Sequence, residues 1–133
     1  ALVIDGDVRT CRSYNIGGNN YFKLRDIAKV LTGSEKQFEV TWNESAKSIK
    51  LKPGTAYTEV GGELETGKAK QQTAKLSTAT VYLNGAVADL TAYNISDNNY
   101  FKLRNLGKQL NFGVDWDGST QSISIDTSKG YTE

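Results

Sequence analysis

The sequence predicts an α+β fold of two tandem repeats, each a small antiparallel β-sheet packed on one short α-helix. The first observation is an internal duplication, because the stretch YNIGGNNYFKLR at 14–25 returns as YNISDNNYFKLR at 93–104. The second is a change in the spacing of hydrophobic residues at the end of each copy of this stretch, from short strand-like runs to the spacing of an amphipathic helix. Since a duplication fixes the architecture before any local interpretation, we expect the order β-β-β-α-β-β twice.

The duplication extends beyond this stretch on both sides. Three more segments match in the same order: 3–8 with 82–87, 38–42 with 112–116, and 49–51 with 123–125. Residues 57–59 also recur, as 131–133, which suggests a fragment of a longer protein. We therefore predict repeat 1 at 1–60, a linker or extended connection at 61–75, and repeat 2 at 76–133.

Each repeat opens with a predicted β-hairpin. Asp5-Gly6 follows a short apolar run and accepts the positive φ of a tight primed turn, and Asn84-Gly85 repeats the signal. The returning strand of the first repeat runs to Ile16, where the turn-rich quartet 17–20 follows. A short aromatic strand at 21–23 then leads toward the helix.

The helix and the two strands after it follow from hydrophobic spacing. The apolar helix positions are Leu24, Ile27, Ala28 and Leu31 in the first copy and Leu103, Leu106, Gly107 and Leu110 in the second. They lie at i, i+3, i+4 and i+7, which places them on one helical face. After the helix, Phe38, Val40 and Trp42 alternate with polar residues, and Ile49 and Leu51 form a closing strand, so both segments are expected to bury one face.

Composition favours a polar globular domain of moderate size. The chain has 133 residues, of which 38% are hydrophobic and 23% charged. Its 16 basic and 15 acidic residues leave a net charge of +1, which gives no electrostatic drive toward nucleic acid or an anionic membrane. No apolar stretch approaches the roughly 20 residues of a membrane helix. Cys11 is the only cysteine, so no internal disulfide can form, and we interpret it as a small buried apolar side chain.

The ordered set of motifs resembles the copper amine oxidase N-terminal-like domain, also called the stalk domain. The motifs that carry the likeness are YFKLRDIA at 21–28 with VTWN at 40–43, and YFKLRNLG at 100–107 with VDWD at 114–117. The likeness covers nearly the whole chain, twice. It implies an antiparallel sheet wrapped on one helix, in a non-catalytic and often repeated module of secreted or wall-attached proteins of Gram-positive bacteria. The family often has proline before Leu-Arg, whereas this chain has Lys23 and Lys102.

Signals for catalysis or metal binding are weak. The chain lacks histidine, which argues against a type-2 copper site and against a histidine-activated nucleophile. Asp115-x-Asp117-Gly118 lacks the later ligands of a calcium loop, so a polar turn is favoured. The carboxylates that could serve glycoside hydrolysis are scattered: Asp26, Glu39, Glu44, Glu59, Glu63 and Glu65. We expect no enzyme activity, no cofactor and no metal; a hydrolase with an unrecognised carboxylate site is the second alternative.

Four duplicated residues are interpreted as structural. Arg25 and Arg104 stand at the predicted helix starts, where each guanidinium would bond backbone carbonyls or a neighbouring carboxylate; clamping a carboxylate ligand is the alternative. Trp42 and Trp116 are also candidates for a flat ring on which a sugar could stack, but they share a strand face with core residues and are expected to be buried.

Tyrosines are the candidates for a ligand surface. Tyr21 precedes Phe22 on a strand, so one of the two rings points inward and the other outward. Tyr100 repeats this arrangement, and Tyr57 is a further candidate for exposure.

The function we expect is that of a non-catalytic tandem module of a secreted or cell-surface bacterial protein, acting as a stalk, spacer or protein-interaction surface. A carbohydrate- or cell-wall-binding module that uses exposed tyrosines is the first alternative. The expected partners are other domains of a longer parent protein, and a cell-wall glycan or another surface protein, without nucleic acid or membrane insertion. The expected location is extracellular or associated with the cell wall of a Gram-positive bacterium.

Overall fold

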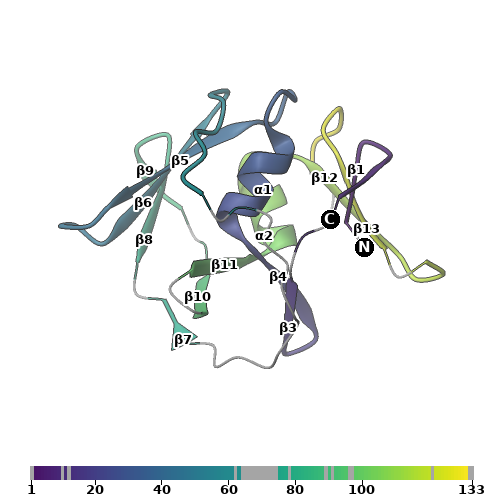
Figure 1. Cartoon of the computed structure of the whole chain (residues 1–133), viewed down its shortest axis with the longest axis horizontal. Coiled ribbons are helices and arrows are strands. Elements are labelled where there is room, and N and C mark those ends of the chain that lie inside the picture. The colour runs from purple at the N-terminus through teal and green to yellow at the C-terminus, as the bar shows by residue number, and fades with distance from the viewer. Residues whose placement is uncertain are drawn as a thin grey trace.

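A computed structural model describes residues 2–9, 11, 13–61, 63, 75–77, 79–88, 90, 92–95, 98–120 and 122–131. Within these residues the fold is α+β, mostly strands in three sheets with two short helices, which confirms the predicted class (Figure 1). The elements before residue 60 are β1 (Leu2–Ile4), β2 (Asp7–Arg9), β3 (Ser13–Ile16), β4 (Asn19–Lys23), α1 (Leu24–Leu31), β5 (Phe38–Asn43) and β6 (Ser48–Pro53). Those after it are β7 (Lys75–Leu76), β8 (Thr80–Leu83), β9 (Ala86–Val87), β10 (Ala92–Ile95), β11 (Asn98–Lys102), α2 (Leu103–Leu110), β12 (Gly113–Asp117) and β13 (Ser122–Asp126).

The opening hairpins have the turns that the sequence predicts. Asp5 and Gly6 have φ of 49° and 88°, and Asn84 and Gly85 have φ of 52° and 82°. Both central residues of each turn are thus left-handed, as a type I′ turn requires. β1 consequently pairs antiparallel with β2, and β8 with β9.

Four strands precede α1 in the first segment, where three were predicted, and five (β7–β11) precede α2 in the second. The expected single strand from residue 7 to Ile16 is divided, because Arg9 pairs with Leu2 in one sheet and Ser13 pairs with Phe22 in another. The chain changes sheets inside this region, between Arg9 and Ser13. The order β-β-β-α-β-β is therefore wrong, by one strand in the first segment and by two in the second.

The central sheet joins the two parts of the chain. Its strand order is β3-β4-β11-β10-β7. β4 and β11 run antiparallel with Phe22 directly opposite Phe101, and Lys23 and Lys102 each face a tyrosine of the other strand. This pairing is symmetric about the two phenylalanines, so equivalent positions of the duplicated motif meet at the middle of the sheet.

Each outer sheet also mixes strands from both parts of the chain. One has the order β12-β13-β1-β2 and the other β5-β6-β8-β9. β1 runs parallel to β13 with Leu2 beside Ile123, and β8 runs parallel to β6 with Val81 beside Ile49. The prediction of one antiparallel sheet per repeat is therefore wrong. Each opening hairpin instead pairs along a closing strand of the other segment, where Leu2 and Ile4 of β1 and Val81 of β8 become buried.

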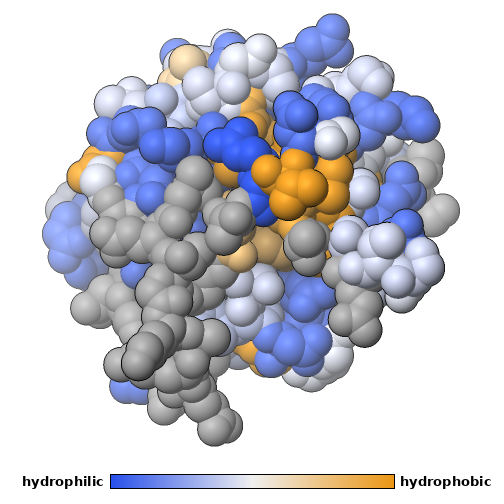
Figure 2. Space-filling view, turned by 45° about the vertical axis from the view of Figure 1, so that its right-hand side comes forward, coloured by the Kyte–Doolittle hydropathy of each residue, from blue (hydrophilic) through white to orange (hydrophobic). Residues whose placement is uncertain are grey.

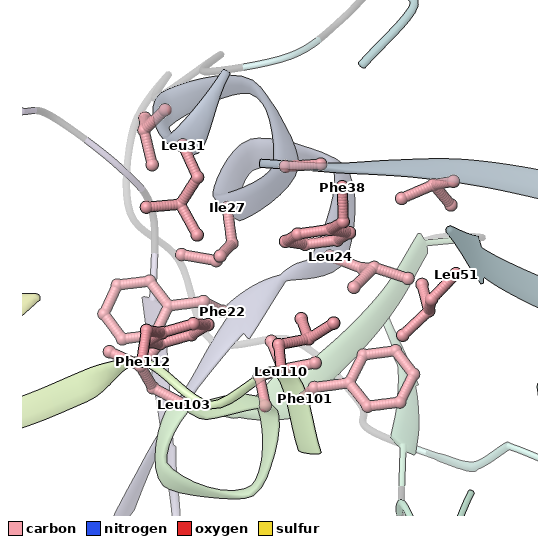
Figure 3. Close-up of a cluster of buried hydrophobic side chains, with 14 of the residues drawn as sticks. Phe22, Leu24, Ile27, Leu31, Phe38, Leu51, Phe101, Leu103, Leu110 and Phe112 are labelled. Atoms are coloured by element: carbon pink, nitrogen blue, oxygen red, sulfur yellow. The ribbon is translucent and has the colours of Figure 1, made fainter. Parts of the chain in front are cut away.

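The main core lies between the helices and the three sheets (Figure 1). Both predicted helical faces are buried, with Ile27, Leu31 and Leu106 at 0% exposure. Figure 3 shows side chains from both helices meeting phenylalanines of the neighbouring strands, including Phe38 of β5, and also Phe112, which directly precedes β12. Because one core contains residues from both segments, folding of the two is coupled through packing as well as through hydrogen bonds.

A second, smaller core lies apart from the main one. Tyr14 packs edge-to-face on Tyr100 with ring centroids 5.2 Å apart, and Tyr21 packs on Tyr93 at the same distance. Ile95 is buried in the same cluster. Every ring pair thus crosses from one segment to the other, so these tyrosines hold the two segments together.

The segment after β6 packs across the first part of the chain, and residues 56–60 form neither helix nor strand. The Thr58 hydroxyl donates to Glu39 Oε2 at 2.6 Å, and Lys29 pairs with Glu59 at 2.6 Å. Of the predicted connection at 61–75, residues 62 and 64–74 lie outside the described residues.

The surface is mostly polar. Figure 2 shows one face on which hydrophilic residues predominate and hydrophobic residues gather in a small group near the middle. Neither helix of the described residues has the length or the apolar character that crossing a bilayer requires.

Candidate functional site

Trp42 and Trp116 are exposed, contrary to the prediction that they lie in the core. Their side chains are 39% and 52% exposed, whereas Val40, two positions earlier on the same strand face as Trp42, is 7% exposed. The alternation is correct, but the strand continues beyond the edge of the core. An exposed tryptophan at each equivalent strand end is the feature around which the candidate site is built.

The first site is a groove beside Trp42, with a volume of about 630 Å³. We call it the Trp42 groove. Its residues from the first segment include Lys23, Arg25 and Trp42, and those from the second include Asn94, Asn98 and Asn99. The floor is apolar and the rim carries charges and amides, a combination typical of small-molecule sites.

The second site is a groove of about 540 Å³ beside Trp116, which we call the Trp116 groove. Its residues include Lys102, Arg104 and Trp116 from the second segment and Asn15, Asn19 and Asn20 from the first. Each of these residues is the counterpart, in the duplicated sequence, of one in the Trp42 groove. The fold therefore builds the same groove twice, each time where one segment meets the other.

The two tryptophans are held differently. Trp42 Nε1 donates to Glu44 Oε2 at 2.6 Å, and Lys47 Nζ donates to Glu44 Oε1 at 2.6 Å. The hydrogen bond from Lys47, followed by that from Trp42, lowers the pKa of Glu44, so the carboxylate stays ionised. In the second copy Gly118 stands where Glu44 is, so this carboxylate anchor is missing beside Trp116.

The two arginines lie at the starts of the helices and line the two grooves. Arg104 Nη1 donates to the Val114 carbonyl at 3.3 Å. Arg25 Nη1 donates to the Tyr57 hydroxyl at 3.2 Å, and its guanidinium lies 5.9 Å from the centre of the Tyr57 ring. Each guanidinium thus donates a hydrogen bond that holds it in the wall of its groove, where it remains positively charged.

Asn99 adds an unsatisfied acceptor to the Trp42 groove. Among the described residues, its Oδ1 is the one buried side-chain polar atom without a hydrogen-bond partner. Buried acceptors without partners cost about 1–3 kcal/mol.

The three tyrosines predicted to form a ligand surface are buried. Tyr21, Tyr100 and Tyr57 have 9%, 5% and 7% exposure. The expectation that they face outward is wrong. On β4 and β11 the main core covers Phe22 and Phe101, and the smaller core covers the adjacent Tyr21 and Tyr100. Tyr57 is buried in the main core. The signal that could have revealed the tryptophans instead is their place at the ends of strands, next to polar turns.

Several carboxylates considered for hydrolysis serve local structure instead. Burial raises the pKa of Glu63, but hydrogen bonds from the Tyr57 hydroxyl and the Val60 N–H outweigh it and lower this pKa to about 2. Asp26 is buried, at 1% exposure.

Burial, and then the charge of Asp26, raise the pKa of the Cys11 thiol to about 11, so the thiol is protonated at neutral pH.

The possible calcium loop is a side-chain-capped turn. Asp117 Oδ1 accepts from the Ser119 N–H at 3.0 Å and from the Ser119 hydroxyl at 2.6 Å. Among the described residues, no group of three or more metal-binding side chains comes together.

Comparisons with protein-family models, with curated proteins and with solved structures found no match to this chain.

Proposed function

We propose that the chain is a non-catalytic tandem module of a secreted or cell-surface bacterial protein, and that it binds cell-wall glycan through the Trp42 and Trp116 grooves. The observation that carries this proposal is the exposed tryptophan beside a groove lined by three asparagines, present twice at equivalent places. The likeness of the motifs to the stalk domain supports the module and its cellular location. The duplicated order of elements supports two tandem repeats.

The chemistry of the grooves suits a sugar ring. An indole offers a flat apolar face, and large aromatic side chains supply most of the contact energy in many binding sites. Asparagine amides both donate and accept, as hydroxyl and acetamido groups require. The apolar floor of the Trp42 groove includes Leu24, Val40 and Ile49. Stacking combined with amide hydrogen bonds favours a saccharide over a purely apolar ligand.

A spacer role is the second candidate, and the shared sheets support it. Each described sheet combines strands from both segments. A pulling force would therefore act on one folded unit and not on two separate domains joined by a linker. This role and glycan binding are compatible in one surface protein.

The test of glycan binding is sedimentation with purified Gram-positive peptidoglycan. We expect the wild type to co-sediment, Trp42→Ala and Trp116→Ala each to weaken binding about tenfold, and the double variant to remain in solution. Val87→Ala is the matched control, because Val87 is 70% exposed and lines neither groove. Equal binding by the wild type and the double variant would contradict the proposal, as would no binding by the wild type.

A further inference from the structure

The two grooves differ in charge although they are built from equivalent residues. The Trp42 groove has four cationic residues, Lys23, Arg25, Lys47 and Lys75, and one carboxylate, Glu44, among its described lining. Its formal charge is therefore +3. The whole chain carries only +1, so positive charge is concentrated at this groove.

The Trp116 groove is close to neutral by the same count. Its described lining has the cations Lys102 and Arg104 and the carboxylate Asp115, which leaves a formal charge of +1. The difference comes mainly from Lys47 and Lys75, which line the first groove alone. Lys75 belongs to β7, the edge strand that pairs with β10. The Trp42 groove thus has an additional wall with its own cation.

Glu44 forms an ion pair with Lys47, so these two charges largely cancel, and the other cations of the described lining are Lys23, Arg25 and Lys75. Both carboxylate oxygens of Glu44 are engaged, one by Trp42 Nε1 and the other by Lys47 Nζ, each at 2.6 Å. The same bonds fix the indole at the edge of the groove. The groove therefore combines an oriented aromatic ring with a positively charged lining.

From this complementarity we propose that the Trp42 groove selects an anionic saccharide, one whose residues carry carboxylate or phosphate as well as hydrogen-bond donors. The Trp116 groove accepts a neutral saccharide. The inference rests on the proposed glycan binding and adds the class of ligand for each groove. Duplication has thus produced two sites built from equivalent residues with different electrostatics, so that one module can recognise a glycan with mixed neutral and acidic residues.

The experiment isolates each groove with a tryptophan variant. Isothermal titration calorimetry compares Trp116→Ala, which retains the Trp42 groove, with Trp42→Ala, which retains the other. The probes are tetragalacturonate, which carries carboxylates, poly(glycerol phosphate), which carries phosphates, and neutral tetra-N-acetylchitotetraose. We expect Trp116→Ala to bind at least one anionic probe about tenfold more tightly than the neutral probe. This preference should fall in 0.5 M NaCl, where screening is strong.

Charge variants in the Trp116→Ala background identify the residues. Lys75→Gln and Lys47→Gln should each weaken anionic binding about two- to fivefold more than they weaken neutral binding, as expected for the loss of an exposed charge. Lys50→Gln is the control, because Lys50 is an exposed cation on β6 that does not line the groove. The carboxylate and phosphate probes distinguish the two sources of negative charge.

Two outcomes overturn the inference in distinguishable ways. Equal affinity of Trp116→Ala for anionic and neutral probes would refute the charge selection while leaving glycan binding in place. No binding of any probe by the wild type, together with no binding to peptidoglycan, would refute both the inference and the proposed function.

Discussion

Among single residues, the tryptophans show how one substitution changes a duplicated site. Glu44 anchors the Trp42 indole, and its counterpart Gly118 has no side chain to do the same for Trp116. A Cβ added at Gly118 would lie 3.6 Å from Trp116 Nε1, so the glycine leaves room beside the ring without being sterically required. The two rings therefore have the same place in the fold and different freedom.

Glu63 provides a prediction on pH dependence. Its pKa is about 2 in the folded protein, against the usual 4.5, because of the hydrogen bonds from Tyr57 and Val60. A lowered pKa of a carboxyl means that its contribution to stability is fully present above pH 4.5 and is lost as the pH falls toward 2. We expect the urea midpoint to fall across this window, and Glu63→Gln to reduce the fall.

The control is Glu35→Gln, which removes an exposed carboxylate of the α1–β5 connection. This variant should keep the wild-type dependence of the urea midpoint on pH. If Glu63→Gln follows the wild-type curve between pH 5 and 2, Glu63 does not carry the acid sensitivity that we assign to it.

Among the elements, the two helices differ in how closely they approach the strand that follows. At Gly107 of α2, an added Cβ would lie 2.8 Å from Val114 Cγ2 and 3.1 Å from the Phe112 carbonyl oxygen. The equivalent residue of α1 is Ala28, which is fully buried. The α2 helix thus packs closer to its following strand than a side chain at this position would allow.

Gly107→Ala tests this packing. Alanine would gain about 1 kcal/mol of helix propensity over glycine, but overpacking costs typically 1–3 kcal/mol. Since one of the close atoms is backbone, we expect a net loss of about 1 kcal/mol in the free energy of unfolding, measured by urea denaturation. Ala28→Gly is the reciprocal variant and should lose at least 1 kcal/mol, because it sacrifices propensity without relieving a clash. A gain in stability for Gly107→Ala would show that β12 can shift away from the added methyl group at little cost in free energy.

At the scale of the whole molecule, the two segments are interlocked. The hairpin at the start of the chain pairs with β13 near its end, and the Thr127 hydroxyl donates to Asp5 Oδ2 at 2.6 Å. The central sheet and the tyrosine cluster add further bonds and contacts between the segments. No described sheet belongs to one segment alone.

This architecture predicts that neither segment folds by itself. We expect fragments 1–60 and 61–133 each to lack a cooperative thermal transition in far-UV circular dichroism, since each would expose half of a shared core. An equimolar mixture should regain the transition in a concentration-dependent manner. Independent cooperative folding of fragment 1–60 would show that the segments are separate domains, as the boundaries expected from the sequence imply.

The sequence by itself determined the features that depend on local pattern. The turns at Asp5-Gly6 and Asn84-Gly85, the bounds of the helix beginning at Leu24, and the buried helical faces follow from residue type and spacing, because φ preference and helical period act over a few residues. The duplication also makes Trp42 and Trp116 equivalent positions.

Only the tertiary structure decided which strands pair and which aromatic rings are covered. Alternation assigns residues to a face of a strand, but it does not say how far the core extends along that face or whether the opposite face is covered too. Alternation alone therefore predicts Trp42 inside and Tyr21 outside, and the structure shows the reverse. Pairing of β1 with β13 depends on strands far apart in the chain, which no local period encodes. The grooves exist because these distant pairings bring the asparagines of one segment beside the tryptophan of the other.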